Sequence, residues 1–211
     1  MTRPRPAAVL LSGALLASLV ACGNKDDSGD LPSLGTSTTT SSAPTPTASA
    51  ASPTPTAVPT RSSQKYGALT LVLDHSAQPP ANAQAALRAY EDYERSSHKS
   101  MATNVEDPNL AKRSAGAALQ DIRGVLKDQK ATGVRTGGLV TVTVKLVGAG
   151  AAVAAFSGCY DQSKSLLVRA NGTSYIGPET KKAPHIQIAV VVTNVTGQWM
   201  VTEYNLKGDK C

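Results

Sequence analysis

The three cysteines, Cys22, Cys159 and Cys211, carry the most reactive side chains of this sequence. A protein thiol can be acylated, can join a second thiol in a disulfide, or can bind a metal ion. A metal site needs further ligands at short spacing, and no histidine (His75, His98, His185) has ligand spacing with Cys159 or Cys211. We therefore predict no metal site and no cofactor, which leaves acylation and disulfide formation.

The segment before Cys22 indicates whether this cysteine is acylated or forms a disulfide. Arg3 and Arg5 form a basic head, an apolar run covers residues 7–20, and small Ala21 precedes the cysteine. This three-part layout is typical of a secretory signal peptide, here residues 1–21. An uncleaved membrane anchor is the alternative, but the apolar run is shorter than the ~20 residues that span a bilayer.

The motif Leu19-Val20-Ala21-Cys22 resembles the lipobox of bacterial lipoproteins. The resemblance implies that the thiol of Cys22 receives a diacylglycerol and that Cys22 becomes the new N-terminus. Each buried CH₂ adds about 0.8 kcal/mol, so two chains anchor a protein stably. We therefore expect a palmitoylated lipoprotein at the extracytoplasmic face of the cell membrane.

Residues 22–64 are expected to form a disordered tether. From residue 31 to residue 63 the chain is almost wholly Ser, Thr, Pro, Ala and Gly, which cannot bury enough apolar surface to offset the ordering entropy. Its prolines favour an extended chain with a reach on the order of 100 Å. The Ser/Thr density is compatible with O-glycosylation, and an unmodified spacer is the alternative.

Residues 65–211 have the length of one ordinary domain. They contain 17 basic and 12 acidic residues, a formal charge of +5 that is spread along the chain. Nucleic-acid binders show basic clusters interleaved with aromatic residues, and this domain has none, so no nucleic-acid partner is expected. Cys159 and Cys211 form an even pair in an exported domain, and we predict a disulfide between them rather than two free thiols.

The domain divides into a helical half and a strand half. From Ala81 to about Lys130 the apolar period is helical, with a break at Asp107-Pro108. From Leu139 onward the period is two, which predicts a meander of strands that ends in a long hairpin of residues 185–193 and 198–206. The segment "ALTLVLD" from Ala68 alternates like an additional strand whose place remains open.

This order predicts an α+β fold in which N-terminal helices pack on a curved antiparallel sheet. It resembles the nuclear transport factor two-like (cystatin-like, cone-shaped) superfamily, in particular small secreted lipoproteins of Gram-positive bacteria. The residues that carry the resemblance are the paired helices, "GVRTGG" at 133–138, "SGCYDQS" at 157–163, "GQWMV" at 197–201 and the terminal Cys211. "YGALTLVLD" departs from this pattern.

The resemblance implies a pocket between helices and sheet, in which enzymes of the superfamily use a carboxylate with Tyr, Asp or His partners. The candidates here are Tyr90, Tyr93, Asp92, His98 and Asp161. Each also has a structural interpretation: the tyrosines as core aromatics, Asp92 and His98 as solvated residues, and Asp161 as a turn cap. His185, after Pro184, is interpreted as an edge residue. Nothing in the sequence requires a nucleophile, a base and an orienting group to lie close together, so we predict no catalytic residues.

Two functional classes remain. The first is a non-catalytic envelope module that binds a small apolar ligand or a protein partner, with Tyr90 and Tyr93 as candidate ligand contacts. The second is a pocket enzyme of the isomerase or cyclase type. A homodimer is a further alternative, because the strand of residues 185–193 has apolar residues on both faces. We favour the binding module, and convergence of ionisable groups in the pocket would favour the enzyme.

Overall fold

The computed structural model describes residues 59–208 and Cys211. The signal peptide, the lipobox cysteine and most of the expected tether lie outside the described residues. Within the described part of the chain, no helix is long and apolar enough to cross a membrane. The first strand begins at Arg61, ahead of the domain boundary that we expected at residue 65.

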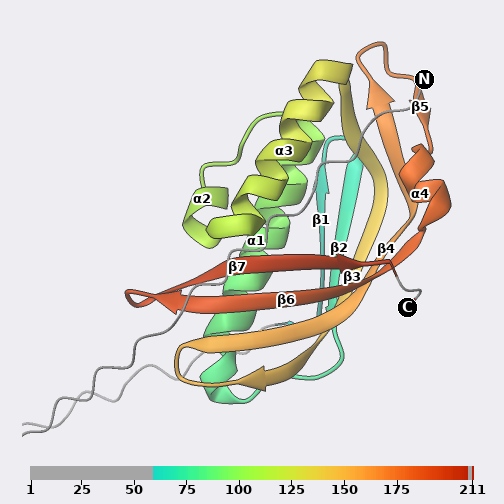
Figure 1. The fold of residues 1–211 in the computed structure, drawn as a ribbon. Helices are drawn as coiled ribbons and strands as arrows, with labels where there is room; N and C mark the ends of the chain where they lie inside the picture. Colours follow the sequence, from blue (N-terminus) through green and yellow to red (C-terminus); the bar gives the residue numbers. More distant parts are fainter. Residues whose placement is uncertain (1–58, 209–210) are drawn as a thin grey trace, which may run out of the picture. The chain divides into compact units, whose positions relative to one another are not determined.

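The described chain forms seven strands and four helices (Figure 1). In chain order they are β1 (Arg61–Tyr66), β2 (Leu69–His75), α1 (Ala81–Thr103), α2 (Leu110–Arg113), α3 (Gly116–Thr132), β3 (Val134–Ala149), β4 (Val153–Arg169), β5 (Ser174–Tyr175), α4 (Pro178–Lys182), β6 (His185–Val195) and β7 (Gln198–Lys207).

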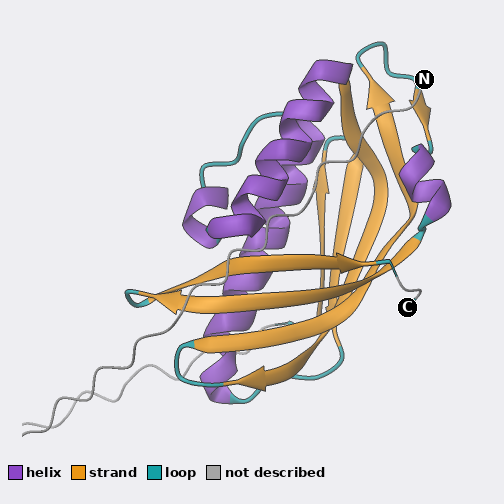
Figure 2. Ribbon diagram, in the orientation of Figure 1, coloured by secondary structure: helices purple, strands orange, loops and turns teal. Residues whose placement is uncertain are grey.

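All seven strands belong to one sheet with the order β1-β2-β3-β4-β6-β7, and the short β5 pairs with β4. Every pairing is antiparallel except that of β2 with β3, which is parallel. Helices α1 and α3 both contact β3 and β7, so these two helices lie together against the sheet, whereas α4 contacts β4 (Figure 2). The sheet is therefore mixed. Its parallel pair consists of β2 and β3, the strands that precede and follow α1, α2 and α3 in the chain.

The expected fold, N-terminal helices packed on a curved antiparallel sheet, is wrong. Two strands precede the helices, the sheet is mixed, and strands make up more of the described domain than helices do. The physical reason lies in β2, where Leu69, Leu71, Leu73 and Val72 are all buried. A strand that is buried on both faces belongs inside a sheet, and a helical crossover from it to β3 makes the two strands parallel. The cone-shaped arrangement that the resemblance implied is therefore wrong as well.

The local predictions for the helices and for the final hairpin are confirmed. Helix α1 ends at Asn104, which adopts a left-handed conformation (φ 57°) before the Asp107-Pro108 break, and α3 ends at Gly133 (φ 66°). Left-handed residues at these positions commonly terminate helices. Strands β6 and β7 form an antiparallel pair across the turn at residues 196–197, with one register shift between Val191 and Val192. The segment from Leu69 is a strand, as its alternation predicted.

One core joins the helices to the sheet. It includes Leu87, Tyr90 and Tyr93 of α1, and Ile188 and Val190 of β6. On β6 the buried residues alternate with partly exposed ones, and Val195 at its end is 42% exposed. The apolar residues on the outer face of this strand are thus only partly covered within the described domain.

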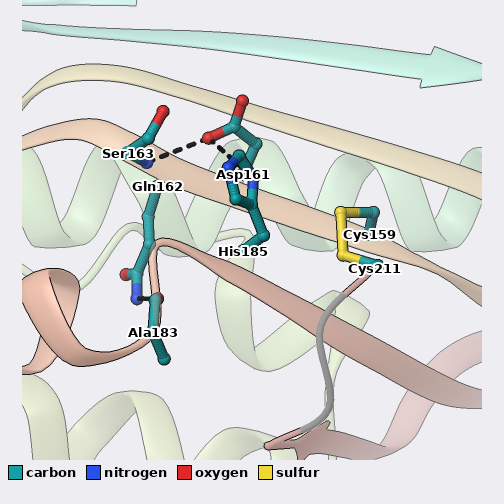
Figure 3. Close-up of a disulfide and its surroundings, with 7 residues drawn as sticks. All are labelled: Cys159, Asp161, Gln162, Ser163, Ala183, His185 and Cys211. Atoms are coloured by element: carbon teal, nitrogen blue, oxygen red, sulfur yellow. Dashed lines mark hydrogen bonds and ion pairs between the residues drawn. A yellow bond between two sulfur atoms is a disulfide. The ribbon is translucent and has the colours of Figure 1, made fainter.

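Strands β3 and β4 approach each other closely at Gly158. A Cβ atom added to Gly158 would lie 1.9 Å from the carbonyl oxygen of Thr143, and this oxygen belongs to the backbone of the neighbouring strand. A side chain of any size is therefore excluded there, because neither strand can move without breaking the ladder. Gly158 precedes Cys159, whose sulfur is bonded to Cys211 with a Cα–Cα distance of 5.7 Å (Figure 3). This geometry is consistent with the disulfide that the sequence predicted.

Candidate functional site

A cavity of about 360 Å³ lies between helices α1 and α3 and strands β4, β6 and β7. We call it the Glu94 cavity. Its size is within the range of small-molecule sites. Its lining consists of Tyr93, Glu94, Ser97, His98, Met101, Asp121, Ile122, Val125, Tyr160, Gln162, Ile186, Tyr204, Asn205 and Leu206.

Glu94 and His98 are buried polar residues in the lining of this cavity. They are one helical turn apart on α1, and each residue is only 1% exposed. The Nδ1 atom of His98 lies 2.8 Å from the backbone oxygen of Glu94 and 3.3 Å from its Oε2 atom. Oε1 of Glu94 is buried and has no hydrogen-bond partner in the described structure. Burying a carboxylate oxygen without a partner is unfavourable, so this atom has unmet hydrogen-bonding capacity.

Tyr160 of β4 completes the array from the sheet side. Its hydroxyl oxygen lies 3.0 Å from Nε2 of His98, and the two rings stack with centroids 5.8 Å apart. A neutral imidazole with its proton on Nδ1 satisfies both contacts of His98. Nδ1 then donates to the Glu94 backbone oxygen, and Nε2 accepts the Tyr160 hydroxyl proton. The polar contacts of His98 therefore do not require the charged imidazolium.

Three further tyrosines surround the carboxylate. Burial is the main cause that raises the pKa of Tyr90, Tyr93 and Tyr204 well above the ordinary value, and the negative charge of Glu94 adds to it. The same causes raise the pKa of Tyr160. The hydroxyls of Tyr90 and Tyr204 are buried without a well-formed hydrogen bond in the described structure. All four rings are therefore neutral at ordinary pH, and their hydroxyls are donors rather than bases.

The sequence candidates divide into those at the cavity and those outside it. Tyr93 and His98 line it, while Tyr90 lies behind Tyr93 in the core, where its ring stacks on Phe156 with centroids 5.7 Å apart. His98 is buried, so our interpretation of it as a solvated residue is wrong: its ring turns inward to Tyr160.

Asp92 lies in a second, polar cleft of about 450 Å³ between β1, α1 and α2. Of the six charged residues that line this cleft, five are in ion pairs, and Lys112 has no ion pair within the described domain. Asp92 contacts Arg113 at 3.0 Å and Arg95 at 3.3 Å, and Lys99 contacts Asp107 at 2.7 Å. This pairing leaves the polar cleft with less unmet bonding capacity than the Glu94 cavity, so we do not place the functional site there.

Asp161 and His185 meet each other outside the Glu94 cavity (Figure 3). Nδ1 of His185 lies 3.4 Å from Oδ1 of Asp161, and both side chains are more than 40% exposed. Oδ1 of Asp161 also accepts a 2.9 Å hydrogen bond from the Ser163 backbone. Burial acts to raise the pKa of Asp161, but the hydrogen bonds from Ser163 and the charge of His185 hold this pKa below its ordinary value. Asp161 lies within β4, opposite His185 at the start of β6, and neither residue lines the cavity.

Sequence reasoning missed Glu94, Tyr160 and Tyr204. A signal for Glu94 was present, because it follows Tyr90 by four residues and precedes His98 by four, on the stripe that also holds Ser97 and Met101. A carboxylate on an otherwise apolar helical stripe indicates a buried charge. No such signal marked Tyr160 or Tyr204, which reach the cavity only through the pairing of β4, β6 and β7. Among the residues with described positions, no group of three or more His, Cys, Asp or Glu could hold a metal ion.

Comparisons with known proteins add little to this geometry. No protein-family profile matches the chain, and no curated protein sequence is similar enough to count as a relative. Among solved structures, the intermembrane space region of the chloroplast protein ARC6 is similar at a TM-score of 0.44 with 11% sequence identity. The alignment covers 62% of this chain and all of that one. Function must therefore be argued from the cavity itself.

Proposed function

We propose that this protein is a membrane-anchored extracytoplasmic lipoprotein whose folded domain binds a small, mainly apolar ligand in the Glu94 cavity. The single observation that supports this function is the cavity itself, which has apolar walls from Met101, Ile122, Val125, Ile186 and Leu206 around a buried polar group. Small-molecule sites combine such walls with few polar anchors. The anchor is supported by the lipobox motif at Cys22 and by the Ser/Thr/Pro-rich segment after it.

The test is to close the cavity without disturbing the core. Val125 of α3 lines the cavity and is 39% exposed, so Val125→Trp places an indole across the opening with little strain elsewhere. Val147 near the end of β3 is 65% exposed and does not line the cavity, so Val147→Trp is the matched control. We expect small apolar molecules to co-purify with the wild type and with Val147→Trp, and to be lost from Val125→Trp in native mass spectrometry.

If Val125→Trp retained the small molecules as well as Val147→Trp does, ligand binding in the Glu94 cavity would be contradicted. Sedimentation of the same samples tests the protein-partner and homodimer alternatives. A wild-type dimer that Val147→Trp or Val125→Trp dissociates, with no small molecule in any sample, would assign the domain to protein association instead.

A second candidate, a pocket enzyme of the isomerase or cyclase type, is favoured by one observation. Oε1 of Glu94 is a buried acceptor without a partner, and the neighbouring tyrosine hydroxyls stay protonated. A carboxylate base beside neutral donors is an arrangement suited to proton transfer next to a carbonyl. Turnover of a ketone or polycyclic substrate that Glu94→Gln abolishes, with binding retained, would establish this candidate. Binding without turnover in the wild type would exclude it for the substrates tried.

A further inference from the structure

We propose that the ligand of the Glu94 cavity is a cationic amphiphile, an apolar molecule that carries one protonated or quaternary amine. This inference rests on the proposed binding function and specifies the chemical class of the ligand. It begins with the sign of the charges around the cavity. Glu94 and Asp121 are the acidic residues of the lining, and none of the described lining residues is Lys or Arg.

The charge of this lining is opposite to that of the domain around it. Residues 65–211 contain 17 basic and 12 acidic residues, so an arbitrary patch of this surface would contain more cations than anions. The cavity contains two carboxylates and no permanent cation. Walls of low dielectric strengthen the field of these two charges, which disfavours an anionic ligand and attracts a cation.

Glu94 supplies the buried counter-charge that such a ligand requires. It is 1% exposed and its Oε1 has no hydrogen-bond partner in the described structure. Its Oε2 lies 3.3 Å from Nδ1 of His98, but the hydrogen bonds of His98 are satisfied by a neutral ring, which supplies no positive charge. A buried carboxylate without a compensating cation is unfavourable, and an ammonium group within the cavity would remove that penalty. Asp121 of α3 is exposed, so the two carboxylates lie at different depths of the same cavity.

Three aromatic rings provide the second element of cation recognition. Tyr93, Tyr160 and Tyr204 all line the cavity, and the rings of Tyr93 and Tyr204 meet at 45° with centroids 5.6 Å apart. The electron-rich faces of aromatic rings attract ammonium groups, and several rings set at angles form the cages that bind quaternary amines. A carboxylate and three tyrosines next to apolar walls thus match a cationic head and an apolar body at once.

The experiment compares three probes with the same chain, octyltrimethylammonium, 1-octanol and octanoate, at concentrations below micelle formation. Calorimetry uses the chain from residue 23 onward, which keeps the tether and the folded domain and lacks the lipid that would itself absorb the probes. We expect the ammonium probe to bind at least about tenfold more tightly than octanol, and octanoate to bind more weakly than octanol. Added salt should reduce the differences in affinity between the charged probes and octanol.

Glu94→Gln keeps the shape of the side chain and removes its charge, so it should abolish the preference for the ammonium probe while octanol binding is retained. Asp121→Asn changes an exposed side chain without altering its size, and should reduce the preference severalfold even if Glu94→Gln fails to fold. Asp128→Asn, on the same helix but outside the cavity lining, is the matched control and should change nothing.

The two proposals fail in different ways. If octanol binds as tightly as the ammonium probe, and neither charge variant alters the order, the cationic ligand class is wrong and the binding function stands. If the wild type binds none of the three probes and Val125→Trp makes no difference to co-purified molecules, the binding function itself is wrong.

Discussion

Nε2 of His98 lies 3.0 Å from the hydroxyl oxygen of Tyr160, although 62 residues separate the two in the chain. The contact joins α1 to β4, a strand that is paired on both sides, with β3 and with β6. A side chain of the helical layer is thus fixed to the middle of the sheet at the polar end of the Glu94 cavity. Glu94 lies one helical turn before His98 on the same helix.

Tyr160→Phe should lower the free energy of unfolding by about 1–3 kcal/mol, because it leaves the buried Nε2 of His98 without its donor. Tyr175→Phe is the control, since Tyr175 is only partly buried and contacts Arg169 through its ring, which the change preserves. Urea denaturation followed by circular dichroism measures both. Equal stability of Tyr160→Phe and wild type would show that the His98 contact contributes nothing.

Gly158→Ala should destabilise the domain by about 3 kcal/mol, at the upper end of overpacking changes, because the added Cβ would overlap the Thr143 carbonyl oxygen. Gly124→Ala is the matched control. Gly124 lies within α3 with open space around it, so alanine there should stabilise by about 0.5–1 kcal/mol through helix propensity. Thermal unfolding should shift the two variants in opposite directions, and a shift in the same direction would refute the close approach of β3 and β4.

Reduction of the Cys159–Cys211 disulfide should lower stability by about 4 kcal/mol, the chain-entropy value for a loop of about 53 residues. Cys159→Ser and Cys211→Ser should each reproduce the loss, and reductant should have no further effect on either variant. A non-reduced digest of the wild type should contain one linked peptide pair by mass spectrometry. Two alkylatable thiols in protein from the native host would contradict the bond.

Alkaline pH should unfold the domain before its four buried tyrosines ionise. The pKa of Tyr90, Tyr93, Tyr160 and Tyr204 is raised in the folded state, whereas the unfolded chain releases these protons near the ordinary value of 10. Above that value the unfolded state holds fewer protons, so the stability that is fully present below pH 10 is lost as pH rises towards the folded-state pKa values. Phenolate absorbance and circular dichroism should change together, and reversible ionisation of all tyrosines in the folded protein near pH 10 would contradict this.

Cys22→Ala should prevent acylation and leave the unprocessed precursor. Cys159→Ser removes a different cysteine and should incorporate labelled fatty acid as the wild type does, provided that it is exported. Metabolic labelling with a fatty-acid analogue measures both. Continued labelling of Cys22→Ala at the wild-type level would place the lipid on another residue.

The sequence predicted the local elements well and their arrangement poorly. The helical period of residues 81–130 and the final hairpin depend on spacing alone, and both were found. Strand β1 escaped detection because Arg61–Tyr66 is mostly polar, as suits an edge strand, and could not be distinguished from the tether before it. The parallel pairing of β2 with β3 joins residues on either side of three helices, and no local pattern encodes such a register.

The site was predictable only in part, for a similar reason. Tyr93 and His98 were among the candidates, and Glu94 could have been found from its place on the apolar stripe. His98 was misinterpreted because it lies off the centre of the helical stripe that contains Tyr90, Tyr93 and Met101, and such positions normally face solvent. Tyr160 and Tyr204 become neighbours of Glu94 only when β4, β6 and β7 assemble, which is tertiary information.

The parallel pairing of β2 with β3 also sets an order for biosynthesis. β2 is complete at His75, but the strand that covers its second edge begins only at Val134. During synthesis or export with the N-terminus leading, an apolar strand is therefore exposed along one edge until residues 76–133 have followed it. A chain that stops within those residues would present an open, apolar edge to other chains, so truncated products should aggregate rather than persist as soluble fragments.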